Sequence, residues 1–274
     1  MHIEAGQVAV VTGGASGIGL ALARAFGAHG MKLMIGDIEE SALAIAADGL
    51  RVDDCDVATH VVDVADEHAM ESFADATYSA FGAAHVVCNN AGVVARHDSW
   101  GPLGDWKWVL GVDLWGVIHG VHSFVPRMLE AGTHGHLVNT ASVAGLLGFP
   151  GIASYTAAKH AVVGLSTSMH HELGDTALGV SVLCPGLVAT NIVNSERNRP
   201  DIEPDQVDNP DFDNPTYSMT GEALPADVVA DQVVAAVQAN RFWVLPHDHY
   251  ADQVIDLAHA RKAGEPPAPP QVRV

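Results

Sequence analysis

Tyr155 and Lys159 are four residues apart, and Ser142 lies thirteen residues before the tyrosine. Residues 154–173 have a helical pattern, so the tyrosine and the lysine point from one face of one helix. A free tyrosine has a pKa of about 10 and is a poor base at neutral pH. An ammonium group one turn away stabilises the phenolate and lowers that pKa. Because the Ser142 hydroxyl can bind a carbonyl or alcohol oxygen, the three side chains together can move a proton on and off a substrate.

The spacing Tyr-x-x-x-Lys alone also fits an ordinary amphipathic helix with one surface lysine, so the surrounding elements must decide. Near the start of the chain, a buried strand over residues 7–12 leads into a glycine-rich turn, residues 13–19, and then into a helix from Leu20. This is the context that a phosphate-binding loop requires. Glycines let the backbone approach a pyrophosphate, and the N-terminus of the helix faces its negative charge.

A second strand, residues 32–37, ends on Asp37, 18 residues after Gly19. In a dinucleotide-binding fold this carboxylate binds the ribose hydroxyls of adenosine and repels a 2'-phosphate. Positions 14–16 and 38 hold no arginine or lysine that would offset the charge. The sequence therefore favours NAD over NADP, although Asp37 could also cap the helix that begins near Glu39.

Strands and helices continue to alternate along the chain. The predicted elements are strand 60–64, helix 66–81, strand 85–89, helix 103–131, strand 136–142, helix 154–173, strand 179–184, helix 225–240 and strand 242–245. This alternation predicts an α/β fold, a single Rossmann-type domain over residues 1–274 with a doubly wound parallel sheet. Its site lies at the carboxyl ends of the strands.

In their order, these motifs resemble the classical short-chain dehydrogenase/reductase family over residues 7–245. The glycine spacing in residues 13–19 and the sequence Asn-Asn-Ala-Gly at 89–92 match its pattern, as do the serine, tyrosine and lysine above. The resemblance implies an NAD-dependent enzyme that transfers hydride between the cofactor and a secondary alcohol or ketone. Tyr155 would exchange the hydroxyl proton, Lys159 would lower its pKa and bind the nicotinamide ribose, and Ser142 would fix the substrate oxygen.

The resemblance also assigns the cofactor site. Asp63 would face the adenine amino group, and the Val188 backbone and the Thr190 hydroxyl would bind the carboxamide. The expected cofactor-binding residues are Gly13, Ser16, Gly17, Ile18, Gly19, Asp37, Asp63, Val64, Asn89, Ala91, Gly92, Tyr155, Lys159, Pro185, Gly186, Val188 and Thr190.

One position departs from the catalytic pattern of the family. Where the family has an asparagine that helps to hold a water near the catalytic lysine, this sequence has Asp113. We expect its carboxylate to lie near Lys159, either in direct contact with it or linked to it through a water. A negative charge there favours the ammonium form of the lysine and disfavours the Tyr155 phenolate.

Residues 191–224 carry four prolines and many carboxylates, which predicts a substrate lid. The lid holds two arginines, Arg197 and Arg199. The proline-rich tail, residues 264–274, is predicted to be loose or to pack on a partner subunit. Since the candidate pocket residues are nearly all apolar, we expect a neutral, hydrophobic substrate. They are Val143, Ala144, Phe149, Leu187, Ile192, Val193, Tyr217 and Met219.

Composition limits the partners. The net charge of −20 disfavours nucleic acid and anionic membranes as partners, and no apolar run approaches the roughly 20 residues of a membrane span. We expect a cytoplasmic protein, because the N-terminus has no signal-peptide pattern and the three cysteines form no CxxC motif. The histidine pairs His134/His136 and His247/His249 lack a third ligand nearby, so no metal site is expected. The resemblance implies a homodimer or homotetramer formed through helices 103–131 and 154–173.

Two other functions remain open. Because of Asp113, the chain could be an NAD-binding sensor or structural subunit with weak turnover. It could also be an isomerase or dehydratase on the same fold that keeps its nicotinamide through the cycle. Net production of NADH from an alcohol would argue against both as the main activity.

Overall fold

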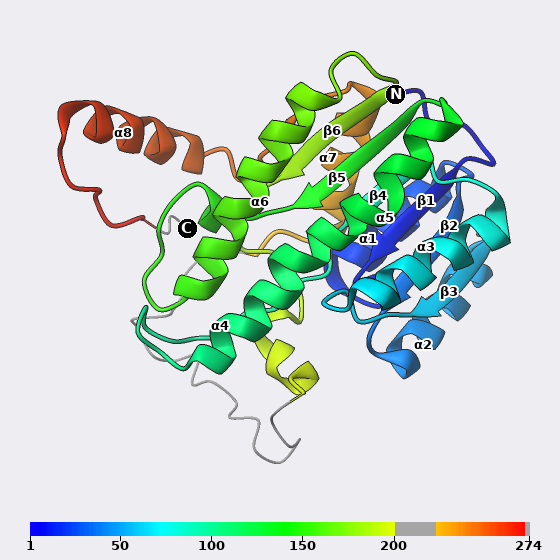
Figure 1. Ribbon diagram of the computed structural model, residues 1–274, viewed down its shortest axis with the longest axis horizontal. Coiled ribbons are helices and arrows are strands. Elements are labelled where there is room, and N and C mark those ends of the chain that lie inside the picture. Colours follow the sequence, from blue (N-terminus) through cyan, green and yellow to red (C-terminus); the bar gives the residue numbers. More distant parts are fainter. Residues whose placement is uncertain (201–222, 272–274) are drawn as a thin grey trace.

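The computed structural model describes residues 1–200 and 223–271. Within these residues, seven parallel strands form one sheet in the order β3-β2-β1-β4-β5-β6-β7 (Figure 1). The order of the strands reverses between β1 and β4, which is where α/β sheets open a binding crevice. The strands are β1 (Val8–Thr12), β2 (Lys32–Asp37), β3 (Val57–Val61), β4 (Val86–Asn89), β5 (Gly135–Thr140), β6 (Leu178–Leu183) and β7 (Trp243–Val244).

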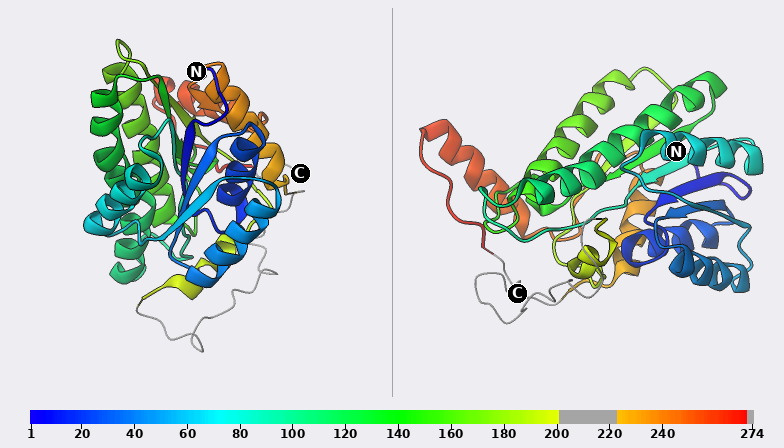
Figure 2. Two further views of the ribbon diagram at one scale, coloured as in Figure 1. Left: turned by 90° about the vertical axis from the view of Figure 1, so that its right-hand side faces the viewer. Right: turned by 60° about the horizontal axis from the view of Figure 1, so that its bottom comes forward.

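Helices cover both faces of the sheet (Figure 2). One face packs against α1 (Gly17–Ala28), α2 (Glu40–Val52) and α7 (Ala226–Gln238). The other face packs against α3 (Glu67–Phe81), α5 (Gly116–Ala131) and α6 (Ala153–Glu172). The predicted doubly wound parallel sheet is confirmed.

Strand β1 shows how the sequence produces this layering. Because successive side chains of a strand point to opposite faces, Ala9 and Val11 pack in the core beneath α1, whereas Val8 and Val10 pack in the core beneath α3 and α5. All four residues are buried. A strand that is apolar on both faces fits only a sheet that is covered on both sides.

Strand β3 occupies residues 57–61 rather than the predicted 60–64. It is an edge strand that pairs only with β2, in a register that starts with Leu33 opposite Val57 and ends with Asp37 opposite Val61. Val62 donates one further backbone hydrogen bond to the Asp37 carbonyl oxygen at 2.9 Å, and the pairing with β2 ends there. Val62 and Val64 instead pack in the core and line the cavity described below.

The predicted helix 103–131 is present as one continuous run of three segments. They are α4 (Leu103–Leu110), a π-helical turn η1 (Gly111–Trp115) and α5. This run is the one described helix that is long and apolar enough to cross a membrane, but half of its most apolar window is buried inside the fold. It therefore gives weak support for a membrane span. The π-helical turn contains Asp113, and such turns occur frequently at functional sites.

A final helix, α8 (Tyr250–Ala263), extends away from the sheet (Figure 1). The chain then turns back along it. Both backbone groups of Gln271 bond to the side chain of Gln253 at 2.8 Å, and Pro270 lines the same cavity. Residues 270–271 of the predicted tail are therefore held against α8 and the cavity.

Candidate active site

A cavity of about 850 Å³ lies at the carboxyl ends of the strands. It is large enough for a cofactor-sized ligand. Most of the residues singled out in the sequence line it. They are Gly13, Ser16, Gly17, Ile18, Gly19, Asp37, Asp63, Val64, Ala91, Gly92, Ser142, Val143, Ala144, Phe149, Tyr155, Lys159, Pro185, Gly186, Leu187, Val188, Thr190, Ile192 and Val193. Tyr217 and Met219 lie outside the described residues.

The glycine turn forms one wall of the cavity with almost no room for side chains. A Cβ atom on Gly19 would lie 2.0 Å from the carbonyl oxygen of Gly13, and one on Gly13 would lie 2.9 Å from the Cα of Ala91. Gly17 has a φ of +51° and packs against the Thr190 side chain. The turn opens onto the N-terminus of α1, where free N–H groups attract phosphate. This wall therefore fits the pyrophosphate of a dinucleotide.

Asp37 lines the cavity at the end of β2. Its Oδ2 accepts a hydrogen bond from the Ala15 N–H at 3.0 Å, and its Oδ1 accepts one from the Glu39 N–H at 3.1 Å. Burial raises the pKa of this carboxyl group, and the two backbone N–H groups oppose the rise. Asp37 thus joins the glycine turn to the start of α2 while its carboxylate stays in the wall of the cavity.

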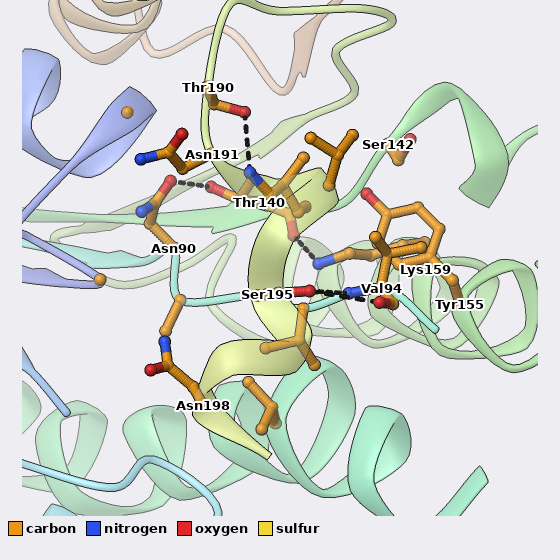
Figure 3. Close-up of a pocket in the computed structure, with 18 of the residues that line it drawn as sticks. Asn90, Val94, Thr140, Ser142, Tyr155, Lys159, Thr190, Asn191, Ser195 and Asn198 are labelled. Atoms are coloured by element: carbon orange, nitrogen blue, oxygen red, sulfur yellow. Dashed lines mark hydrogen bonds between the residues drawn. The ribbon is translucent and has the colours of Figure 1, made fainter. Parts of the chain in front are cut away.

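The catalytic candidates gather at the other end of the cavity (Figure 3). The Nζ of Lys159 lies 5.4 Å from the centre of the Tyr155 ring and donates a hydrogen bond to the Thr140 carbonyl oxygen at 3.0 Å. The Ser142 hydroxyl lies 3.3 Å from the Pro185 carbonyl oxygen and accepts a hydrogen bond from the Ala144 N–H. A strand end and a helix thus bring three proton-handling groups to one place.

Comparisons with known proteins agree with this geometry. The family model described as "short chain dehydrogenase" matches residues 7–201. The chain belongs to the short-chain dehydrogenase/reductase family. It is 37% identical over 247 residues to 1-deoxy-11-beta-hydroxypentalenate dehydrogenase of Streptomyces avermitilis, which covers 89% of this chain and 85% of the relative.

Two further relatives span nearly the whole chain. A CLA biosynthesis dehydrogenase/reductase of Lactiplantibacillus plantarum is 30% identical, with 91% of each protein covered. The crystal structure of a short-chain dehydrogenase/reductase from Burkholderia phymatum in complex with NAD is 37% identical, with a TM-score of 0.91 and 99% of each chain covered. Members of the family are oxidoreductases that use nicotinamide cofactors, so this chain is assigned to that class.

The charges around Tyr155 compete. Burial raises the pKa of its phenol, the Lys159 ammonium lowers it, the Asp113 carboxylate raises it, and a hydrogen bond with Ser142 lowers it; the net result is a pKa above its usual value. Burial works to lower the pKa of Lys159, but Asp113 and Tyr155 raise it above its usual value. Lys159 is therefore held as an ammonium ion, which can support a phenolate.

Asp113, where this short-chain dehydrogenase/reductase departs from the family pattern, is fully buried. Its Oδ1 accepts a hydrogen bond from the Val93 N–H at 2.8 Å, and its Oδ2 lies 3.1 Å from the Nζ of Lys159. The carboxylate thus lies beside the lysine and contacts it directly rather than through a water. Burial raises the pKa of Asp113, and the Lys159 charge opposes that rise.

Asn89, which was expected at the cofactor site, does not line the cavity. Side chains two apart on a strand share a face, so Asn89 points, like Val87, toward the side that α5 covers. There it is buried and donates a hydrogen bond to the Asn139 side chain at 2.9 Å. The next residue, Asn90, leaves the strand and lines the cavity, where its side chain accepts a hydrogen bond from Thr140 (Figure 3).

The described part of the predicted lid also lines the cavity. Residues 192–198 form the short helix η3, and Arg197 and Asn198 donate hydrogen bonds to the Glu39 carboxylate at 2.5 and 2.8 Å. Burial works to raise the pKa of Glu39, but these two side chains bring it below its usual value. Glu39 and Arg197 are 158 residues apart in the sequence, so no local pattern indicated this pair.

Two cations that were not predicted from the sequence, Arg96 and Lys107, also line the cavity. Neither position belongs to a recognised motif, since Arg96 follows the Asn-Asn-Ala-Gly segment and Lys107 lies on α4. Within residues 1–200 and 223–271, no cluster of His, Cys, Asp and Glu side chains is arranged to hold a metal ion.

Proposed function

We propose that this protein is an NAD-dependent oxidoreductase that interconverts a secondary alcohol and a ketone. The observation that supports this most strongly is the arrangement of Tyr155, Lys159 and Ser142 at one end of a cavity whose other end carries Asp37. When bound, the nicotinamide supplies the hydride chemistry. The NAD complex of the Burkholderia phymatum relative supports the choice of cofactor.

The residues of the chain handle the proton and the oxygen. Tyr155 takes the hydroxyl proton from the alcohol at its phenolic oxygen and returns it to the ketone in the reverse direction. Lys159, held as an ammonium ion, favours the phenolate form of Tyr155. The Ser142 hydroxyl exchanges its long bond to the Pro185 carbonyl oxygen for one to the substrate oxygen and so stabilises the charge that develops there.

A screen of secondary alcohols and ketones, followed by nicotinamide absorbance, tests this function. We expect NAD-dependent oxidation of neutral, apolar alcohols, because Val143, Phe149, Leu187 and Ile192 line the cavity. Each alcohol should be paired with an analogue that carries a carboxylate. Activity confined to the anionic analogues would contradict the substrate class and would point to Arg96 and Lys107, which also line the cavity, as their binding groups.

The same screen separates the other functions. Tight NAD binding without turnover over a broad panel would indicate a sensor or structural subunit. Conversion of substrate without net NADH would indicate an isomerase or dehydratase that keeps its nicotinamide through the cycle.

Cofactor choice gives a second prediction. Catalytic efficiency should be at least about tenfold higher with NAD than with NADP, because an unpaired charge repulsion costs more than about 1.4 kcal/mol. Asp37→Ala should reduce this preference for NAD over NADP. Asp63→Ala is the matched control, since it removes a carboxylate expected at the adenine and should weaken both cofactors alike. A wild-type preference for NADP would mean that Asp37 does not face the ribose.

We also propose that the chain acts in the cytoplasm as a homodimer or homotetramer. Trp115 and Leu129, which lie at the start and near the end of α5, are exposed apolar side chains, and a second copy would cover them. The three cysteines are free thiols, which suits a reducing compartment. Light scattering that gives the mass of a single chain would contradict the assembly, and recovery in a secreted fraction would contradict the location.

A further inference from the structure

The histidine pair His247/His249 was given no role from the sequence, yet the structure places His247 against the backbone of the cavity wall. His247 follows β7, and its ring lies against the segment that follows β6. Its Nδ1 lies 3.0 Å from the N–H of Gly186, and its Nε2 lies 3.0 Å from the carbonyl oxygen of Leu187. One imidazole ring therefore holds two consecutive residues of this segment.

These two partners fix the state of the ring. The Gly186 N–H can only donate, so Nδ1 must be the nitrogen without a proton. The Leu187 carbonyl oxygen can only accept, so Nε2 must carry the proton. The geometry thus requires neutral His247 with its proton on Nε2. A second proton would place an N–H on Nδ1 against the N–H of Gly186, and this bond would be lost.

The segment that His247 holds is a wall of the catalytic end of the cavity. Pro185, Gly186, Leu187 and Val188 all line it. From the opposite side, the Pro185 carbonyl oxygen accepts hydrogen bonds from the Val143 N–H at 2.9 Å and from the Ser142 hydroxyl. The segment is thus held by hydrogen bonds from the proposed catalytic serine and from His247, which lies in the loop between β7 and α8.

The contact is tight as well as polar. A Cβ atom on Gly186 would lie 3.0 Å from Cε2 of Tyr250 and 3.1 Å from Cγ of His247. Tyr250 is the first residue of α8 and is buried. The packing leaves the backbone at Gly186 little room to shift while the ring remains in place.

We propose that neutral His247 is a positioning residue that holds the backbone beneath the nicotinamide, and that protonation of His247 releases this backbone. The proposal rests on the proposed function, because that function places the nicotinamide on this segment. It predicts that binding of the nicotinamide half of the cofactor depends on His247 and on pH. Binding of the adenosine half should depend on neither through this residue.

The surroundings set the direction of the pH effect. Burial lowers the pKa of His247, the Leu187 carbonyl raises it, His249 lowers it and Asp248 raises it, and the pKa falls below the usual 6.5. The Tyr250 ring also lies near His247, at 6.4 Å between ring centres, and burial raises the pKa of Tyr250. The segment 185–190 has no titratable side chain. The bond is therefore intact at neutral and higher pH and is lost as the pH falls through the lowered pKa.

The test compares the binding of NAD with that of ADP-ribose, which lacks the nicotinamide, by titration calorimetry at about pH 7.5 and about pH 5. For the wild type, the preference for NAD over ADP-ribose should fall at the lower pH, toward the value shown by His247→Ala. Asp37 lies at the adenosine end, so a change in its protonation alters the affinities for NAD and for ADP-ribose alike. That change cancels in the ratio of the two affinities. His247→Ala should show the reduced preference at both pH values.

Two further variants test whether the pH dependence comes from protonation of His247. In His247→Gln, an uncharged amide can still donate to the Leu187 carbonyl oxygen, so the preference should vary less than about threefold with pH. His249→Gln, in which the altered residue packs on Tyr250 at 4.3 Å between ring centres, is the matched control. It removes a group that lowers the pKa of His247, so the preference for NAD should fall by the same factor as in the wild type, but at a higher pH.

The outcomes separate the two proposals. If the wild type binds NAD and its preference over ADP-ribose is unchanged by pH and by His247→Ala, the role of His247 is refuted and the proposed function stands. If the wild type fails to bind NAD, the proposed function fails first. Equal losses for both ligands in His247→Ala would mean a general loss of structure and would also overturn the positioning role.

Discussion

Tyr155→Phe is expected to lower turnover by at least about a hundredfold, the usual contribution of a positioned acid or base, while NAD affinity stays within a few-fold of wild type. Phenylalanine keeps the ring that packs beside Lys159 and Val93 and loses only the oxygen that carries the proton. Steady-state kinetics with the best alcohol from the screen, together with NAD titration, measure both quantities.

The control for this substitution is Tyr78→Phe. Tyr78 lies on α3, its hydroxyl is buried, and burial raises its pKa. It therefore resembles Tyr155 in environment but does not line the cavity. We expect full turnover from Tyr78→Phe, and turnover near the wild-type rate in Tyr155→Phe would refute the mechanism.

The sequence predicted the sheet because the information for it is local. Val8, Ala9, Val10 and Val11 form a short run that is apolar on both faces, and the glycine turn that follows can only precede a helix. Local patterns did not predict where β3 ends, because the end of a strand depends on the neighbouring strand with which it pairs. The apolar residues after Val61 extend the strand pattern, but β2 ends at Asp37, so the pairing ends as well.

The site was predicted less completely than the sheet. Asn89 belongs to a recognised motif, but the alternation of β4 directs its side chain into the core. The contact between Glu39 and Arg197 joins segments 158 residues apart, and that between Gly186 and His247 joins segments 61 residues apart. Such contacts depend on how the finished sheet brings the loops together, and no local pattern carries that information.

Asp113→Asn is expected to move the alkaline-side rise of alcohol oxidation to lower pH by about one unit, equivalent to about 1.4 kcal/mol. The carboxylate lies 3.1 Å from the Nζ of Lys159 and raises the pKa of Tyr155. Removing its charge leaves the ammonium ion less neutralised and so favours the phenolate. The asparagine carbonyl can still accept the hydrogen bond of the Val93 N–H, so the fold should survive.

The control for Asp113→Asn must also lose a buried ion pair, because breaking such a pair is costly in itself. Asp105 on α4 is buried and lies 2.6 Å from Arg199. Asp105→Asn should lower the melting temperature and leave the pH profile in place. Profiles of turnover at saturating NAD, with melting temperatures for both variants, therefore separate local electrostatics from lost stability.

Three results for Asp113→Asn have different physical meanings. A downward shift in the pH profile means that Asp113 is ionised and restrains the phenolate. An unchanged profile means that burial keeps Asp113 protonated, since burial raises its pKa. An upward shift means that Lys159 loses its own proton once the carboxylate is gone, because burial alone lowers the pKa of the lysine. Either of the last two results contradicts the proposal that Asp113 restrains the phenolate. The upward shift would mean that its support of the Lys159 charge outweighs its repulsion of the phenolate.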